Sequence, residues 1–551
     1  TDRQRVDMRF KADRVPLDDA LAGALGESSR KALDSLNAVG EARDVSAELT
    51  QTGDEDVDYS VTCRLDDLAF RYEDFPYAVT DAGCRVRITP GRVRIRDLDG
   101  RHGNAKIRLG CTLFTEDVEG GGLRLAVDVL DMALDEDLYA ALGPRMRAVW
   151  DRMRPAGTAD VSIVRLEENT PRNPGSLDYE IVMLPKSMTV GAAGLPYRFA
   201  VRQGRKPDEG LIVFTPGRVS LRTLESPSSA EAPRLRSLSG EARYDDHSVR
   251  IDLAFQADGL PLDAKRLQAM PDWATPITSR LTGGGTMDLD LSKLEMDMPV
   301  DGAATRPATA PATRPAGDGM TWALAGEARL KDVGFDVGLD ECTASGTFRG
   351  TAERTAEGLS VDGAIEKMDV HLGDGRRVSG LNARVRNRGE TGLSVEDLSA
   401  KVYGGRLAGR AAFELDGKTR FDIGMSFEDL KVEEFIGKKP DAEGPSVTGR
   451  IDGKMALSGA LGDVKKRRAS GQLRIENANL SRLPIPLGLL RVMHLTLPGE
   501  QPFSDGFVEY HMAGRKLVLT EIHLVGGSAS SLVGSGTVDM KNNRLKLKFL
   551  T

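Results

Sequence analysis

The alternation of apolar and charged residues is the feature of this sequence that most constrains its fold. It recurs along the chain, for example at residues 93–96, 106–109, 123–129, 250–255, 287–291 and 545–549. Successive side chains of a β-strand point to opposite faces, so each stretch would form a strand with one aliphatic face and one charged face. Antiparallel sheets commonly have one dry and one wet face. The pattern therefore predicts many antiparallel strands and too few helices to cover them.

Composition supports this interpretation and excludes other classes of protein. The 551 residues include 60 glycines and only 5% aromatic residues, which favours many turns over a helical bundle. A chain of this length exceeds one ordinary globular core. With a formal net charge of −8, it lacks the basic excess typical of nucleic-acid binding.

Internal repeats indicate how the strands are organised. The pentapeptide at 89–93 recurs identically at 215–219, and looser copies occur at 392–398 and 514–519. Helix-like segments alternate with these strands at 14–37, 131–153, 259–281 and 430–436. Repeats that each carry an unburied aliphatic sheet face must stack to hide it. We therefore expect a mainly β fold: an elongated, repeating antiparallel β-groove, formed by a curved sheet with an apolar interior and short interspersed helices.

The sequence divides into three parts. Residues 1–300 hold three units of helix plus strands, and residues 320–551 form a β-rich C-terminal region. Between them, residues 301–319 are rich in Pro, Ala and Thr and have no apolar face, which is typical of a solvated linker or loop insertion.

The aliphatic face is the candidate binding site. An aliphatic trough poor in aromatic and polar side chains suits acyl chains, because the hydrophobic effect is non-directional. The groove-facing candidates are Val93, Ile95, Ile107, Leu109, Val219, Leu221, Ile251, Leu253, Val395, Leu517 and Leu519. The alternative is a core in which the same residues pack against helices or a facing sheet.

Other sequence features have more ordinary explanations. Cys63, Cys84, Cys111 and Cys342 form no CxxC pair and are expected to be buried thiols, although a disulfide among the first three stays open. The apolar stretch 483–493 is either a buried helix or a segment that contacts a membrane interface. The acidic runs 54–58 and 97–100 lack the spacing of a calcium loop. We predict no catalytic residues, no metal site and no cofactor.

Two C-terminal stretches carry a family resemblance. Residues 398–413, with Tyr403-Gly404-Gly405, and residues 503–540, with Gly534-Ser535-Gly536, resemble the C-terminal region of AsmA-like proteins, the family that includes TamB and YhdP. The resemblance covers roughly residues 360–551 and implies a periplasmic, inner-membrane-anchored β-groove. It also implies a part in outer-membrane biogenesis and in the movement of phospholipid between membranes. We expect any membrane anchor to lie outside this chain.

Two hypotheses about function follow. The first is a non-enzymatic lipid-binding or lipid-transfer conduit of the bacterial cell envelope, with phospholipid and the two membranes as partners. The second is a structural or chaperone-like module that assists assembly of outer-membrane proteins by offering strand edges.

Overall fold

The chain forms two compact units in the computed structural model. The first comprises residues 1–260, 269–271 and 295–314, and the second residues 261–268, 272–294 and 315–551. The structure describes residues 5–550 apart from 25–26, 53–56, 115–121, 171–172, 192–194, 205, 228–232, 246, 271–277, 279–280, 300–319, 337–340, 356–357, 374, 389–391, 415–418, 436–447, 461–462, 479–503, 527–530 and 541–543. The proposed linker 301–319 lies outside the described residues, so this division stays a prediction.

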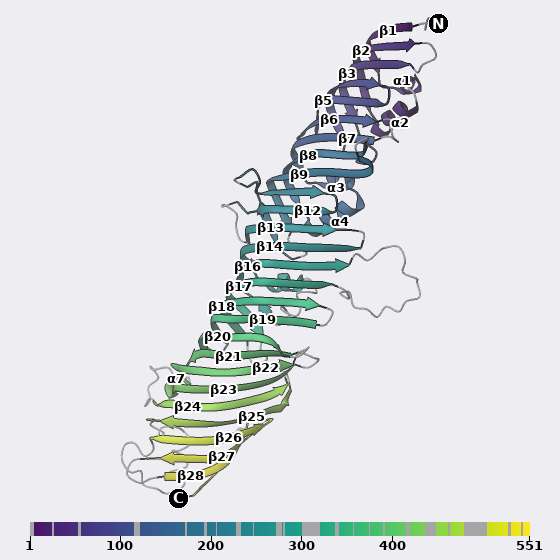
Figure 1. Cartoon of the computed structure of the whole chain (residues 1–551). Coiled ribbons are helices and arrows are strands. Elements are labelled where there is room, and N and C mark those ends of the chain that lie inside the picture. The colour runs from purple at the N-terminus through teal and green to yellow at the C-terminus, as the bar shows by residue number, and fades with distance from the viewer. Residues whose placement is uncertain are drawn as a thin grey trace. The chain divides into compact units, whose positions relative to one another are not determined.

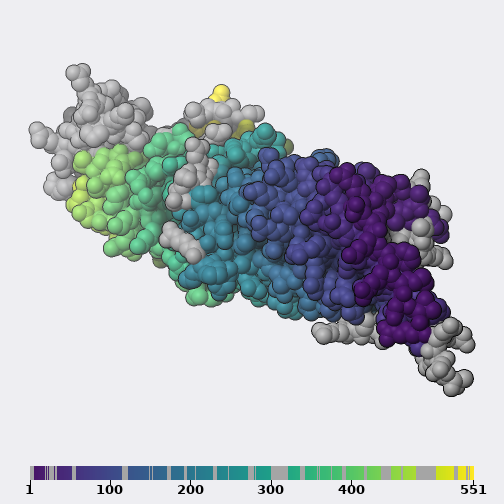
Figure 2. All heavy atoms as spheres, turned by 90° about the horizontal axis from the view of Figure 1, so that it is seen from above, coloured from purple at the N-terminus to yellow at the C-terminus, as the bar shows by residue number. Residues whose placement is uncertain are grey.

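The described strands belong to one antiparallel sheet of 29 strands, which confirms the mainly β fold. Most strands pair with their neighbours in sequence, as in β1–β2 and β27–β28 (Figure 1). Among the exceptions, β10 and β11 both pair with β9, and β15 pairs with β17. The colours in Figure 2 accordingly change in chain order across the surface of each unit.

The strands that begin in the first unit are β1 (Arg5–Pro16), β2 (Val39–Thr52), β3 (Asp58–Phe70), β4 (Val79–Thr89), β5 (Arg92–His102), β6 (Ala105–Phe114), β7 (Gly122–Ala133), β8 (Ala156–Thr170), β9 (Asn173–Gly191), β10 (Arg198–Val201), β11 (Leu211–Thr215), β12 (Arg218–Leu224), β13 (Arg234–Tyr244) and β14 (Ser248–Pro261). Those that begin in the second unit are β15 (Leu281–Gly283), β16 (Thr286–Pro299), β17 (Thr321–Asp336), β18 (Glu341–Thr355), β19 (Gly358–Leu372), β20 (Arg377–Arg388), β21 (Gly392–Val402), β22 (Gly405–Glu414), β23 (Arg420–Lys431), β24 (Arg450–Ala460), β25 (Asp463–Glu476), β26 (Asp505–Ala513), β27 (Lys516–Val525), β28 (Ser531–Asp539) and β29 (Arg544–Leu550).

The described helices lie within the segments that the sequence predicts as helix-like. They are α1 (Asp19–Ala24), α2 (Glu27–Leu36), α3 (Glu136–Ala141), α4 (Pro144–Met153), α5 (Ala264–Gln268) and α7 (Val432–Phe435). The segment 131–153 holds two helices because Gly143-Pro144 ends one and begins the next, with proline in the first turn of α4. Its first residues belong to β7, and Asp135 caps α3 by accepting a hydrogen bond from the Leu138 backbone N–H at 3.1 Å.

A β-bulge with an aspartate in the left-handed conformation interrupts many of the strands. The φ angles of eight such aspartates lie between 50° and 61°, and the strand register shifts beside each one: Asp44, Asp67, Asp81, Asp97, Asp131, Asp332, Asp397 and Asp429. The extra residue interrupts the alternation, so the next inward-pointing side chain lies three positions after the previous one, as Leu98 lies after Ile95. The residues that follow six of these aspartates are buried: Leu68, Ala82, Leu98, Met132, Val333 and Leu430.

Side chains on the next strand accept hydrogen bonds from backbone groups that the bulges remove from the ladder. The Asp131 N–H donates to Asp160 Oδ1 at 2.8 Å, and the Asp429 N–H donates to Asp452 Oδ1 at 2.7 Å. The Asp332 N–H donates to Ser345 Oγ at 2.8 Å. Because these donors are satisfied, the bulges are fixed features of the sheet, and bulges bend the strands that contain them.

Asp67 offers a direct test of the bulge. Its φ is 53°, its side chain is 89% exposed, and it precedes the buried Leu68. Asp67→Gly should leave β3 as stable as in the parent chain, because glycine adopts this conformation without strain, whereas Asp67→Val should destabilise it by about 1–2 kcal/mol. Amide hydrogen exchange of β3 and β4 measures the difference. Equal exchange in the two variants would contradict the assigned conformation.

Candidate functional site

Cross-strand register brings the predicted groove residues of the first unit into two adjacent apolar rows. The first row contains the predicted residues Leu109, Val219 and Ile251, and runs Leu98, Leu109, Val127, Ile163, Ile181, Phe214, Val219, Ala242, Ile251. The second contains Ile107, Leu221 and Leu253, and runs Gly100, Ile107, Val129, Val161, Met183, Ile212, Leu221, Gly240, Leu253. Residues two apart on a strand share a face, so both rows lie on one face of the sheet.

Val93 and Ile95 extend the same face of β5. Ile95 lies opposite Val86 on β4 and Cys111 on β6, and Val93 lies opposite Ile88 and Leu113. All eight predicted residues of the first unit therefore belong to one apolar surface.

The second unit repeats this arrangement. Val395 and Leu517 fall in a third row, which runs Val385, Val395, Ala411, Ile423, Leu457, Ala469, Met512, Leu517, Val538. Leu519 falls in a fourth row beside it, which runs Leu398, Gly409, Met425, Met455, Gly471, Tyr510, Leu519, Gly536, Leu547. We call these rows of the second unit the apolar face of β20–β29.

Burial differs among the predicted residues. Ile107 and Val219 are buried, with 4% and 6% of their surfaces exposed. The other nine predicted residues are half-buried. Each unit thus leaves part of an aliphatic surface in contact with solvent, which a close-packed core would not do.

Aromatic side chains on this face lie over glycines of the neighbouring strand. A Cβ atom on Gly453 would come within 2.6 Å of the Phe427 ring, and one on Gly471 within 2.7 Å of the Tyr510 hydroxyl. The two residues of each pair lie directly opposite each other on neighbouring strands. A larger residue at Gly453 or Gly471 would therefore have to displace the aromatic side chain opposite it.

The Tyr403-Gly404-Gly405 motif has a structural role at the end of this face. Tyr403 and Gly404 have φ angles of 48° and 72° and form the turn between β21 and β22. The Tyr403 carbonyl accepts from the Lys431 N–H at 2.8 Å, and its ring meets Phe435 of α7 edge-on, with centroids 5.5 Å apart. Leu430, Val432 and Ile451 form the adjoining buried cluster, so α7 closes the bulged end of the strands.

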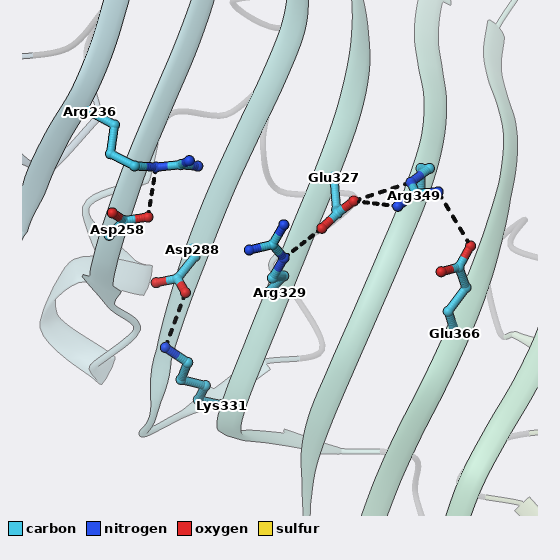
Figure 3. A network of polar contacts seen from close by, with 8 residues as sticks. All are labelled: Arg236, Asp258, Asp288, Glu327, Arg329, Lys331, Arg349 and Glu366. Atoms are coloured by element: carbon cyan, nitrogen blue, oxygen red, sulfur yellow. Dashed lines mark hydrogen bonds and ion pairs between the residues drawn. The ribbon is translucent and has the colours of Figure 1, made fainter.

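The opposite face carries ion pairs between strands. In Figure 3, Glu327 of β17 points toward Arg329 of the same strand and Arg349 of β18. Glu327 Oε1 lies 2.5 Å from Arg329 Nε, and Oε2 lies 2.6 Å from Arg349 Nη2. The hydrogen bonds from Arg349 and then Arg329 lower the pKa of Glu327. Such pairs keep this face in water and fix the register that holds the other face apolar.

A wide depression of about 1080 Å³ lies on the second unit. Its lining includes six residues of the fourth row, Leu398, Gly409, Met425, Met455, Gly471 and Tyr510, together with polar residues next to them in sequence, such as Arg410, Ser426 and Lys454. The depression is wide and open, so the candidate site is an extended surface.

The four cysteines form no disulfide, and three of them lie along the apolar face of the first unit. Cys63 and Cys111 are half-buried and Cys84 is buried. Burial raises the pKa of the Cys63 thiol, and burial raises the pKa of the Cys84 and Cys111 thiols to about 12. These groups are therefore weak nucleophiles at neutral pH.

Some rows contain residues that the alternation did not single out. Ile181, Met183, Ile212 and Phe214 lie in continuous apolar stretches, where both strand faces are apolar and period two gives no signal. The stretch 483–493 lies outside the described residues. Within the described ranges no group of side chains could hold a metal ion, and no helix there is long and apolar enough to cross a bilayer.

Comparisons with protein-family models, curated proteins and solved structures found no match to this chain.

Thiol reactivity tests the environment of the apolar face. At pH 8 a thiol of pKa 9.0 is about one-tenth ionised, whereas a pKa of about 12 leaves about one part in ten thousand, so Cys84 and Cys111 should react with a disulfide reagent roughly 1000-fold more slowly than after unfolding. The native rate should rise about tenfold per pH unit above pH 8. Because the unfolded chain loses these protons first, the fold should also lose stability above about pH 9. Equal native and unfolded rates would show that the thiols lie in water.

Proposed function

We propose that the protein is a non-enzymatic lipid-binding or lipid-transfer conduit of the bacterial cell envelope, which holds phospholipid acyl chains along its apolar sheet face. The observation that carries this proposal is the unbroken apolar register of the half-buried rows. No charged residue interrupts the fourth row from Leu398 to Leu547. Eight steps between strands, at about 4.8 Å each, give this row a length of about 38 Å.

The chemistry of the face suits an acyl chain. Burying each methylene group of a lipid contributes about 0.8 kcal/mol, and adjacent positions in a row are nearly equivalent. A chain held by aliphatic contacts alone can therefore move along the row without breaking a directional bond. The ion pairs of the opposite face stay in water during such movement.

The envelope location, the two membranes as partners and the part in outer-membrane biogenesis extend this proposal from the resemblance of residues 360–551 to AsmA-like proteins. The ladder of apolar rows is the feature that such a function would need.

Leu519 and Val518 provide a matched pair of test positions. They are neighbours on β27 but point to opposite faces, since Leu519 lies opposite Tyr510 and Val518 lies opposite His511. Leu519→Asp should reduce the phospholipid that copurifies with the protein at least about tenfold, because a charge in an apolar contact costs a few kcal/mol. Val518→Asp should leave it unchanged. Mass spectrometry of extracted lipid gives the amounts, and circular dichroism confirms that both variants fold.

A crosslinking measurement covers the case in which Leu519→Asp fails to fold. Phospholipid with a photoreactive group in its acyl chain should label peptides of the parent chain that contain Val395, Leu517 or Leu519. Absence of both copurified and crosslinked phospholipid would refute lipid binding. Crosslinks to β-barrel proteins in its place would support the structural or chaperone-like module.

A further inference from the structure

Four arginines come together on the polar face of the first unit. In the register of β4 and β5, Arg85 lies directly opposite Arg96, and Arg87 lies directly opposite Arg94. Arg85 and Arg87 are two residues apart, as are Arg94 and Arg96, so all four side chains share one face. Their Cβ atoms stand at the corners of a quadrangle of about 5 by 7 Å. We call this group the arginine cluster.

The arginine cluster carries an excess of positive charge. Arg85 is paired with Asp97 at 2.5 Å. Within the described part of the chain, the side chains of Arg87, Arg94 and Arg96 have no ion pair or hydrogen bond. Like charges directly opposite each other destabilise a sheet, so the free protein bears a cost at this position.

The arginines on the neighbouring strands β3 and β2 have carboxylate partners. Arg64 continues the row of Arg85 onto β3, and Arg43 continues it onto β2. Arg64 Nη2 lies 2.9 Å from Asp66, and Arg43 Nε lies 3.3 Å from Glu41. Arg64 and Arg43 therefore each have a carboxylate beside them, which Arg87, Arg94 and Arg96 lack among the described residues.

The side chains around the cluster leave it open to a ligand. Thr62 flanks Arg87 on β3, and Thr112 flanks Arg94 on β6. Gly110, two residues before Thr112, has open space where a Cβ atom would stand. Arg87 and Arg96 are exposed and Arg94 is half-buried. An anion can thus reach the guanidinium groups, and two threonine hydroxyls stand beside them as further donors.

We propose that the arginine cluster is a binding site for a phosphate-bearing ligand. A guanidinium group presents two parallel N–H donors that match phosphate oxygens, and rigid strands hold four such groups within reach of one another. The ligand is either a soluble di- or polyphosphate or the phosphate of a phospholipid headgroup. The site lies on the face opposite Val86 and Val93, so it does not depend on acyl chains occupying the apolar face.

Two probes distinguish the sources of phosphate. Calorimetry with inorganic pyrophosphate measures soluble ligand, and flotation with phosphatidylcholine vesicles, with and without phosphatidic acid, measures headgroup binding. The parent chain should bind at least one probe, and Arg87→Gln with Arg94→Gln should weaken that binding at least about tenfold, given the strength of charge-assisted hydrogen bonds. Pyrophosphate binding identifies a soluble ligand, and binding only to vesicles that contain phosphatidic acid identifies a headgroup.

The matched control is Arg218→Gln with Arg243→Gln, since Glu241 bridges these two polar-face arginines of the same unit at 2.5 Å each. This control should bind the probe as the parent chain does.

Thermal unfolding without ligand separates binding from a structural role. Arg87→Gln should melt no lower than the parent chain, because it removes a repulsion, and it should lose the rise in melting temperature that the bound probe gives the parent. Failure of the parent to bind either probe would overturn the proposal. Unchanged binding by the double variant, whatever its melting temperature, would overturn it equally.

Discussion

Each unit depends on backbone hydrogen bonds between consecutive strands, and the aspartate bulges decide how those strands present their side chains. A ladder without bulges would keep strict alternation and a uniform twist. Inserting one left-handed residue, as at Asp97 or Asp429, bends the strand and returns an apolar residue to the inner face. The aspartate bulge therefore accounts both for the buried ends of the strands and for the half-buried rows.

The two faces of the sheet stabilise each other's arrangement. Slipping a strand by one residue would expose its aliphatic side chains and bury its charges. Cross-strand pairs such as Glu327 with Arg349 oppose this slip on the wet side, and ring-over-glycine contacts such as Phe427 on Gly453 oppose it on the dry side. Contacts on both faces of the sheet thus fix the same strand register. That redundancy allows the apolar rows to remain partly uncovered without losing their alignment.

The sequence alone predicted the class of fold and the existence of an apolar face, because alternation reports directly on strand faces. It placed Val395 and Leu517 on strands but could not show that they share a row, since register depends on turn lengths and bulges. The bulge signal was present in the repeats, as Asp97-Leu98 and Asp397-Leu398, yet aspartate is also common in ordinary turns. The opposition of Arg87 and Arg94 likewise requires the pairing of β4 with β5.

The pairing of most strands with their sequence neighbours has a consequence for how such a chain can change over evolution. In a meander such as β21–β29, an added or deleted hairpin alters only the two contacts at its borders. The apolar rows can therefore be lengthened or shortened by two strands at a time, while the remaining strands keep their pairing partners. The length of the apolar rows can thus change in evolution through the number of hairpins in the chain.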